Sequence, residues 1–452
     1  MIFGTKHLFL DSRVVDRIEN VRLVLGRVEK DACNPLFIED KPWEVRFDNL
    51  YPNVIFDDME QLYKAWYNPY IVDEVSSATP LAKRKSIPYD PYLIGKVREA
   101  GVCYATSRDG IVWEKPELGI IEFDGSKRNN LVMRGVHGVG IKKDLHDPDP
   151  ARRYKALLLN QLAETVERNR CGVATSPDGL HWAAVTCPEI GAEGNSHNNF
   201  IWDDRQGKYI GITRLWDGDQ RLVGRTESAD FRRWTRSVEI LRAAPDAPQR
   251  QTYAMTIFRY ADVYLGLLMI FGRIGETMKG TVDCELAWSP DSLHWERLCA
   301  GTPLIQRGPA GSFDSGCIFG AASPIIRENE VRLYYAGSDG LHGDWRNGGF
   351  GLTRLRPDRF AGLSGTGIVV TKPIRCTGKR LWVTADAAGG VVRAAVLGHD
   401  AFSLSRSRPI SADVTDGLVN WRSSENLAAL SGTTIELVFE LNHATIYAFG
   451  FD

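Results

Sequence analysis

The sequence lacks the features that define several large protein classes. No stretch reaches the ~18 apolar residues of a membrane-spanning helix, and the N-terminus has no signal-peptide pattern, so we expect a cytoplasmic protein without a membrane partner. Neither sign of charge dominates, since 55 Lys+Arg oppose 57 Asp+Glu. This balance argues against a nucleic-acid partner and suits a neutral ligand better than a polyanion.

Metal-binding spacings are also missing. The eight cysteines form no CxxC or CxH pair, so we expect buried thiols rather than zinc ligands or a disulfide framework. The stretch Asp144-Leu-His146-Asp-Pro-Asp149 offers oxygen ligands, but its sequence is typical of a solvent-facing hairpin tip. We therefore expect no metal among the functional groups.

Long helix-forming runs are scarce, whereas glycine and aromatic residues are plentiful. The chain has 43 Gly among its 452 residues, above the average of about 7%, together with 12 Trp, 15 Tyr and 18 Phe. Glycine-rich turns between short aromatic strands are typical of β-proteins. We expect a nearly all-β fold.

An internal repeat is the strongest positive signal. The pattern Ser-x-Asp-x-x-x-Trp occurs four times and ends at Trp113, Trp182, Trp234 and Trp295. Each copy follows a strand-like run, so we expect the aspartate to cap the backbone amides of a turn and the tryptophan to wedge between neighbouring sheets. A fixed motif on a loose period of 50 to 70 residues is typical of β-propeller blades.

Apolar hairpins precede the four motifs, and a fifth hairpin covers 320–338. These segments predict a five-bladed β-propeller over 51–371, in which radial repetition protects the sheet edges. After about residue 372 the apolar residues alternate with a period of two without the motif, which predicts an antiparallel β-sandwich over 372–452. Residues 1–50 are interpreted as a lead-in that packs on the propeller.

Several further motifs resemble the five-bladed glycoside hydrolases of families 32, 43, 68 and 117. The similarity is greatest to a bacterial family-32-like branch. The motifs are Asn34-Pro-Leu, Pro42-Trp-Glu, Phe313-Asp-Ser-Gly, Tyr334-Tyr-Ala-Gly-Ser-Asp-Gly and a closing Tyr447-x-Phe. The resemblance implies an active site in an axial funnel, where carboxylates from separate blades cleave a glycosidic bond. It also leaves room for a structural Ca²⁺ near the axis.

The expected catalytic carboxylates are missing from their usual positions. Where family 43 enzymes place Asp, Asp and Glu, the aligned strands carry Tyr51, His137, His197 and Gln251. We therefore select Asp48, ahead of the first blade, and Asp314, in the loop entering the fifth, as the catalytic carboxylates. His197 or Glu193 is the provisional general acid, because histidine titrates near neutral pH and Glu193 lies close to it in sequence.

Other polar and aromatic residues gather at strand starts and second-strand ends, which face the funnel in this fold. Aromatic faces can stack on sugar rings while amides, guanidiniums and carboxylates take the hydroxyls. The predicted substrate-binding residues are Asn49, Trp66, Tyr67, His137, Asn198, Arg214, Trp216, Gln251, Tyr253, Asp339 and His342.

These observations predict a glycoside hydrolase that acts on a small glycoside or oligosaccharide. A non-catalytic carbohydrate-binding propeller is the first alternative, because the family carboxylates are absent. A related transferase or phosphorylase is the second, and it would need a basic cluster for phosphate around Arg214, Arg250 and Arg273. The oligomeric state does not follow from the sequence.

Overall fold

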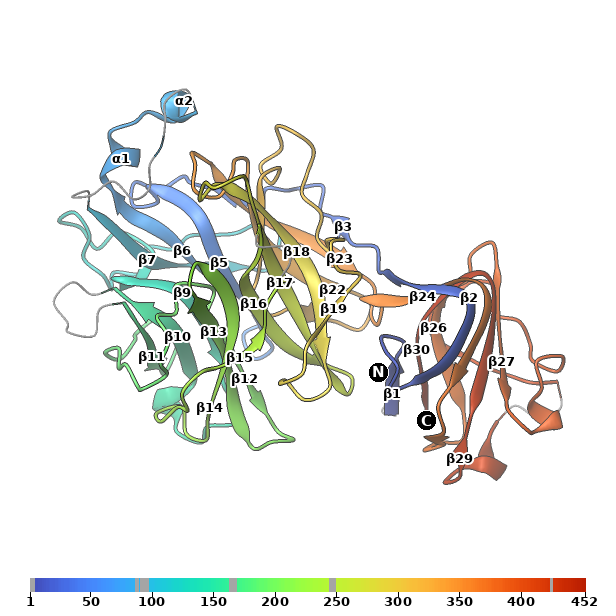
Figure 1. The fold of residues 1–452 in the computed structure, drawn as a ribbon. Helices are drawn as coiled ribbons and strands as arrows, with labels where there is room; N and C mark the ends of the chain where they lie inside the picture. The colour runs from blue at the N-terminus through green and yellow to red at the C-terminus, as the bar shows by residue number, and fades with distance from the viewer. Residues whose placement is uncertain (1–4, 86–88, 90–96, 162–168, 244–248, 423–425) are drawn as a thin grey trace.

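The computed structural model describes residues 5–85, 89, 97–161, 169–243, 249–422 and 426–452. The chain forms a larger and a smaller lobe, with both termini at the smaller one (Figure 1). Two short α-helices, α1 (Glu74–Ser77) and α2 (Leu81–Arg84), lie at one end of the larger lobe, and the other described elements are strands and three short 3-10 turns. None of the described helices is long and apolar enough to cross a membrane.

The first half of the larger lobe consists of three antiparallel meanders, in which consecutive strands pair. The first contains β5 (Arg46–Asp57), β6 (Leu62–Asp73), β7 (Arg98–Ser107) and β8 (Leu131–Arg134). The second contains β9 (Val136–Lys143), β10 (Tyr154–Asn160) and β11 (Arg170–Ser176). The third contains β12 (Asn199–Asp203), β13 (Lys208–Asp217), β14 (Gln220–Ser228) and β15 (Val238–Leu241).

The second half of this lobe is a ten-stranded sheet made of two further meanders, joined by one parallel pair, Val282 with Cys317. One meander contains β16 (Arg250–Tyr260), β17 (Val263–Arg273), β18 (Gly280–Ser289) and β19 (Glu296–Leu298). The other contains β20 (Cys317–Gly320), β21 (Ile325–Ile326), β22 (Val331–Ser338) and β23 (Gly348–Leu355), with β3 (Glu29–Lys30) and β4 (Phe37–Ile38) as its outer strands. The N-terminal segment thus completes the last meander.

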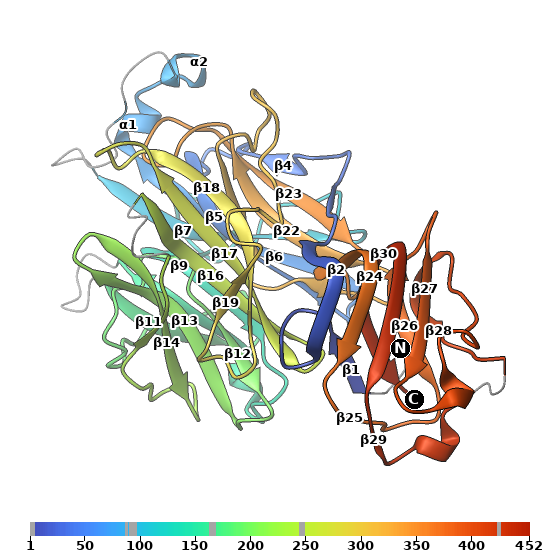
Figure 2. The same ribbon diagram turned by 45° about the vertical axis from the view of Figure 1, so that its right-hand side comes forward.

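Burial explains why β17, the second strand of its meander, is continuously apolar over its first nine residues. In β17 the first nine residues, Val263–Phe271, are all buried, because neighbouring sheets cover both faces of the strand. The largest hydrophobic cluster joins the first meander to the last two and includes Leu50, Leu267 and Phe350. The first meander therefore packs against the last two, and Figures 1 and 2 show the five meanders together in the larger lobe.

The repeated turns have the predicted chemistry. In each motif one aspartate oxygen accepts the backbone N–H groups two and three residues later, at 2.8–2.9 Å; the four aspartates are Asp109, Asp178, Asp230 and Asp291. The tryptophan wedge is confirmed for Trp113, whose ring lies edge-on to Phe350 and Tyr334 of the last meander. These aspartates are engaged in the turns.

The smaller lobe is a seven-stranded sheet with a two-stranded ribbon. It contains β1 (Thr5–Leu8), β2 (Val15–Leu25), β24 (Ala361–Thr371), β26 (Leu381–Asp386), β27 (Val391–Val396), β28 (Asp413–Leu418) and β30 (Leu437–Phe451). The ribbon pairs β25 (Ile374–Arg375) with β29 (Thr434–Ile435). Residues of β30 before His443 pair with β27, and those after it pair with β26 and β1, so this one long strand serves both halves of the lobe.

The strand pairing differs from the predicted division in two places. β1 and β2 belong to the smaller lobe rather than to a lead-in on the larger one, because β2 pairs along β24 and β1 along the end of β30. β24 also belongs to the smaller lobe, which moves the boundary from residue 372 to about residue 361. Alternating apolar residues predict a strand, but they do not name its partner.

A buried carboxylate joins the two lobes where the chain crosses between β23 and β24. Asp358 accepts hydrogen bonds from Lys6 on β1 at 2.8 and 2.9 Å and from Thr384 on β26 at 2.7 Å, all within the smaller lobe. It also accepts one from Tyr260, at the end of β16 in the larger lobe, at 2.7 Å. This one side chain therefore fastens the lobes together.

Candidate active site

A cavity of about 560 Å³ opens in the larger lobe where first strands begin and second strands end. Asp48 lies near the start of β5, His137 near the start of β9 and Tyr253 near the start of β16, while Arg214 lies near the end of β13. The strands of a meander run antiparallel, so starts of first strands and ends of second strands meet at one end of the lobe. A volume of this size suits a small-molecule ligand.

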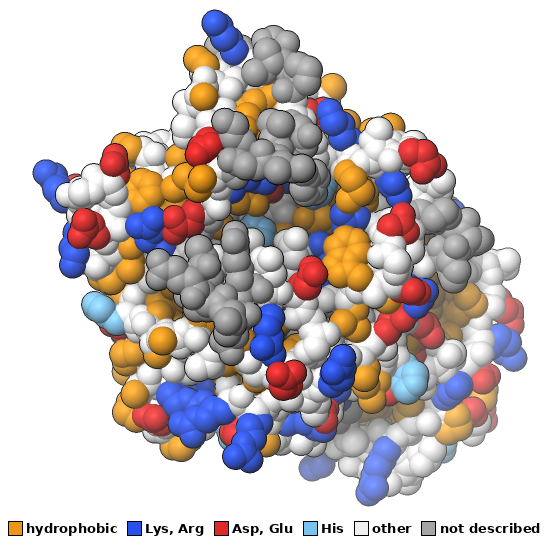
Figure 3. Space-filling view, turned by 60° about the vertical axis from the view of Figure 1, so that its left-hand side comes forward, with side chains coloured by type: hydrophobic (Ala, Val, Ile, Leu, Met, Phe, Trp, Pro, Cys, Tyr) orange, Lys and Arg blue, Asp and Glu red, His pale blue; other side chains and the backbone are white. Residues whose placement is uncertain are grey.

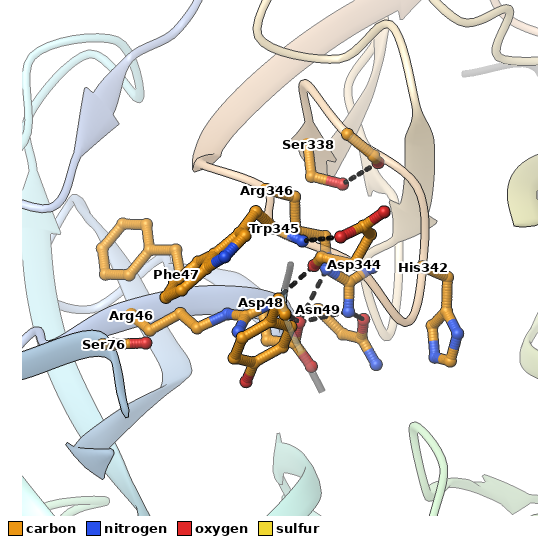
Figure 4. A network of polar contacts seen from close by, with 12 residues as sticks. Arg46, Phe47, Asp48, Asn49, Ser76, Ser338, His342, Asp344, Trp345 and Arg346 are labelled. Carbon is orange, nitrogen blue, oxygen red and sulfur yellow. Dashed lines mark hydrogen bonds and ion pairs between the residues drawn. The ribbon is translucent and has the colours of Figure 1, made fainter. Parts of the chain in front are cut away.

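Asp48 is the only carboxylate among the described residues that line the cavity. Arg346 donates to it from Nε at 2.7 Å and from Nη2, and Arg46 lies at 3.5 Å. Figure 4 shows Asp48 and Asn49 facing Arg346, with Arg46 on one side and His342 on the other. Burial alone would raise the pKa of Asp48, but the charges of Arg346 and Arg46 outweigh burial and hold the pKa well below its usual range. The carboxylate is therefore ionised at neutral pH.

A hydrogen-bonded chain continues from Asn49 across the cavity. Asn49 accepts from Arg346 at 2.9 Å and donates through Nδ2 to the hydroxyls of Tyr51 (2.6 Å) and Tyr253 (2.9 Å). The Tyr253 hydroxyl lies 3.0 Å from Nε2 of His342. Because Asn49 already donates to the Tyr253 oxygen, the tyrosine can give its own proton to His342.

The two histidines of the cavity are uncharged. Burial lowers the pKa of His137 to about 4, although the charge of Asp48 opposes this shift. Burial, and then the charge of Arg346, lowers the pKa of His342 well below its ordinary value. Both imidazoles therefore act at neutral pH as hydrogen-bonding groups rather than as cations.

The described lining of the cavity includes five arginines, and each lies near an aromatic ring. The guanidinium carbon of Arg46 lies 4.2 Å from the ring centre of Tyr89, and that of Arg98 lies 4.0 Å from that of Tyr70. Arg214 lies 4.3 Å from Tyr253 and 5.5 Å from Trp216, while Arg221 lies 4.9 Å from Trp216. The fifth, Arg346, holds Asp48.

The charge of the cavity differs from that of the whole chain. Five guanidiniums and one carboxylate line it among the described residues, and Arg98 has a further carboxylate partner in Asp73, at 3.0 Å. The net charge of −2 is spread over a surface where acidic and basic side chains are mixed, as the face in Figure 3 shows. The expectation of a neutral ligand rested on that average, which does not describe the lining of the cavity.

Seven of the residues predicted from the sequence line the cavity: Asp48, Asn49, His137, Arg214, Trp216, Tyr253 and His342. Gln251 does not line the cavity itself. Its side-chain oxygen accepts a hydrogen bond from Arg221, which does line the cavity. Trp216 has 39% of its surface exposed, which leaves its face available to a ligand.

The remaining predicted binding residues lie outside the cavity and are occupied with structural contacts. Trp66 donates to the carbonyl of Gly179 at 2.7 Å, and Tyr67 donates to Glu44 at 2.6 Å. Asn198 donates to the backbone of Gly138 and Gly194 and accepts from Thr213, and Asp339 accepts from Lys85 and Asn347.

Three of the four predicted catalytic residues also lie elsewhere. Asp314 accepts hydrogen bonds from Lys30, Tyr335 and Ser312, and so ties β3 to β22. His197 is buried against the ring of Tyr51, with centroids 5.3 Å apart, and burial lowers its pKa to about 3, so it does not carry a proton at neutral pH. Glu193 is exposed in a separate surface depression that Arg170 and Arg236 also line.

Sequence reasoning missed four arginines and two tyrosines of the cavity. They are Arg46, Arg98, Arg221, Arg346, Tyr70 and Tyr89. Arg46 and Arg98 begin β5 and β7, so their position at a strand start was a signal that could have found them.

In the described ranges, no three His, Cys, Asp or Glu side chains are grouped so that they could hold a metal ion. The acidic stretch after β9, which offered oxygen ligands for a metal, instead binds a lysine. Lys155 reaches Asp144 at 2.6 Å and Asp147 at 2.9 Å. The ammonium group is fully buried between the two carboxylates, and together with Arg152, 3.4 Å from Asp147, it balances their charge.

Comparison with known proteins shows the fold. No protein-family model and no curated protein matches the chain. Among solved structures, β-1,2-mannobiose phosphorylase from Listeria innocua is 13% identical, with a TM-score of 0.50 over 73% of this chain and 97% of that one. A glycosyl hydrolase from Bacteroides ovatus is 15% identical, with a TM-score of 0.48 over 74% and 95% of the two chains.

A third similar structure is an N-acetylgalactosamine deacetylase from F. plautii in complex with blood group B trisaccharide. It is 15% identical, with a TM-score of 0.47 over 75% of this chain and 96% of that one. The chain therefore has a nearly all-β fold that is also found in a carbohydrate-active phosphorylase. Membership of families 32, 43, 68 or 117 remains a prediction.

Proposed function

We propose that the protein is a carbohydrate-active enzyme that hydrolyses a glycosidic bond in the cavity around Asp48. The observation that carries this proposal is the convergence of one ionised carboxylate, neutral hydrogen-bonding groups and an exposed tryptophan face in one cavity at the strand ends. The fold shared with a mannobiose phosphorylase supports it. In this proposal the five meanders are the blades of a propeller and the smaller lobe is a β-sandwich.

Asp48 has the properties of a base rather than an acid. It is ionised at neutral pH and oriented by Arg346, so in this proposal it is the group that takes a proton from the water molecule that attacks the anomeric carbon. The carbon–oxygen bond to the leaving sugar then breaks, and the leaving oxygen takes a proton. Tyr253 is the proposed donor: its proton, which otherwise bonds to His342, is transferred to the leaving oxygen, while Asn49 keeps donating to the phenolic oxygen.

Phosphorolysis is a second candidate, favoured by the arginines of the cavity. Phosphate in place of water would attack the anomeric carbon and leave as a sugar 1-phosphate. The predicted basic cluster is only partly assembled there. Arg214 lines the cavity, whereas Arg250 pairs with Glu285 and Arg273 with Asp219.

The test is turnover of a panel of aryl glycosides and oligosaccharides with and without inorganic phosphate. Free sugar in the absence of phosphate supports hydrolysis, and sugar 1-phosphate that requires phosphate supports phosphorolysis. Asp48→Asn should abolish either activity. Asp314→Asn is the matched control, because it also removes a buried carboxylate that holds a cation, but outside the cavity.

Two results would count against the proposal. If folded Asp48→Asn and Asp314→Asn proteins lost activity equally, Asp48 would not be the catalytic base. Sugar binding without turnover of any glycoside would favour the non-catalytic carbohydrate-binding alternative.

A further inference from the structure

We infer that a groove on the smaller lobe binds a short segment of another protein, in which apolar residues lie between basic ones. The groove has a volume of about 760 Å³ and crosses β2, β24, β30 and β27, which lie together in the smaller lobe (Figure 2). The inference is independent of the reaction proposed for the cavity around Asp48. We call this site the acidic groove, and its defining residues are Ile368, Val370, Val438, Asp16, Asp400 and Glu436.

The apolar part of the acidic groove is the outer face of a sheet. Val370 on β24 is directly opposite Val438 on β30, and Ile368 is two residues before Val370 on the same strand face. The residues that alternate with them, Val369 and Phe439, point the other way and are fully buried in the core of the lobe. The outer face of such a sheet is usually polar, because it meets water. An apolar outer face inside a groove is typical of a binding surface.

The charge of the acidic groove is negative. Its described lining includes four carboxylates and one guanidinium. The guanidinium, on Arg17, lies 3.1 Å from Glu19, so these two charges offset each other. The other three carboxylates, of Asp16, Asp400 and Glu436, have no ion-pair partner among the described residues. A ligand that carries positive charge would therefore meet three carboxylates that are free to pair with it.

The carboxylates lie at both ends of the apolar face. Asp16 belongs to β2, at one edge of the four strands. At the other edge Asp400 follows β27, and the backbone carbonyl of Glu436 accepts from Leu397, directly after β27, at 2.9 Å. Neighbouring strands are ~4.8 Å apart, so the face is about 14 Å wide, which is the length of roughly four extended residues. The geometry fits a short apolar stretch with a basic residue at each end.

The chemistry of the acidic groove disfavours other classes of ligand. None of its described lining residues is Phe, Tyr or Trp, so it offers no aromatic face on which a sugar ring could stack. Nucleic acids and anionic membranes would be repelled by the unpaired carboxylates. A basic protein segment with an apolar centre uses both the charge and the apolar face.

Fluorescence anisotropy with the full-length protein tests the inference. The probes are labelled synthetic peptides with three to five leucine and valine residues in the centre and two lysines on each side. Comparison peptides have glutamates in place of the lysines, or serines in place of the central residues. We expect at least one lysine-flanked apolar peptide to bind about 10-fold more tightly than both of its comparison peptides. This preference over the glutamate peptide should weaken as salt is raised.

Variants locate the bound peptide. Asp400→Asn combined with Glu436→Gln removes two charges from the acidic groove and should weaken binding about 10-fold. Asp124→Asn combined with Glu328→Gln is the matched control, because it changes the net charge equally through exposed carboxylates of the larger lobe, and it should leave binding unchanged. Val438→Thr keeps a β-branched residue on the strand but makes the apolar face polar, and it should weaken binding about threefold. Thermal unfolding checks that each variant is folded.

Each outcome decides the inference. Binding of a lysine-flanked apolar peptide that only the groove variants weaken supports it. If no such peptide binds more tightly than both comparison peptides, the inference is wrong. Equal weakening by the two double variants would show unspecific attraction of charges and would also overturn it. If the protein sediments as a dimer that Val438→Thr dissociates, a second copy of the chain covers the groove, and the inference is again wrong.

Discussion

Replacing Asp48 with asparagine tests the electrostatics of the cavity most directly. The amide keeps the shape of the side chain but removes the only carboxylate among the described lining residues. Arg346 loses two charge-assisted hydrogen bonds, from Nε at 2.7 Å and from Nη2, and keeps its contact with Asn49 at 2.9 Å.

The expected cost follows from those contacts. Hydrogen bonds to charged groups contribute roughly 1.5–3 kcal/mol each. The Asp48 side chain is 14% exposed, so water in the cavity compensates part of the loss. We expect Asp48→Asn to lower the free energy of unfolding by about 2–4 kcal/mol at pH 7.

The pH dependence has a defined sign. The pKa of Asp48 is lower in the folded than in the unfolded protein, so its stabilising contribution is complete above the unfolded value of about 4. That contribution is lost as the pH falls from about 4 through the folded pKa. The difference between wild type and variant should therefore stay constant from pH 8 to pH 5 and shrink only below about pH 4.

The assay is unfolding in guanidinium chloride, followed by far-ultraviolet circular dichroism at several pH values. A difference under about 0.5 kcal/mol at pH 7 would show that the arginines do not depend on this carboxylate. A difference that shrinks between pH 7 and pH 5 would show that the folded pKa of Asp48 is not lowered.

Three further predictions concern other parts of the molecule. Trp216→Ala should weaken sugar binding about 10-fold in a titration while leaving thermal stability almost unchanged, because the ring is 39% exposed. Asp358→Asn should lower the free energy of unfolding by about 3 kcal/mol and expose the crossing between the lobes to proteases, and Tyr260→Phe should do so less. Lys155→Met should destabilise the fold by about 3–5 kcal/mol in denaturant unfolding, because it leaves two carboxylates without their buried cation.

Local chemistry made the repeated turns predictable. An aspartate such as Asp178 bonds the amides two and three residues later, so the whole interaction lies within one short stretch of sequence. The same holds for the strands before the turns, whose apolar residues mark burial. Most of the larger lobe could therefore be divided into hairpins from the sequence.

Non-local pairing was not predictable in the same way. The residues of β2 alternate as they would in any half-buried strand, and nothing in them identifies β24 as the partner. The carboxylates show the same limit. Asp314 lies just before β20 and Asp48 near the start of β5, and only the packing of the meanders places Asp48 at the cavity while Asp314 contacts Tyr335.

Four of the five arginines among the described lining residues were missed for a related reason. Taken singly, Arg46 or Arg221 resembles a cation on the surface of a strand, because each is flanked by ordinary polar and apolar residues. Their meaning arises only when strands from different meanders bring five guanidiniums to one cavity. Composition cannot reveal this, since the opposite charges are distributed over the rest of the surface.

The path of the N-terminal segment limits how this two-lobed chain can be divided. Within about forty residues it supplies β1 and β2 to one lobe and β3 and β4 to the other, and its partners are strands from the second half of the sequence. Such long-range closure slows folding, because neither lobe has all its strands until distant parts of the chain have met. A fragment cut at the visible waist between the lobes would lose edge strands from both, so the intact chain is the smallest unit to express and study (Figure 2).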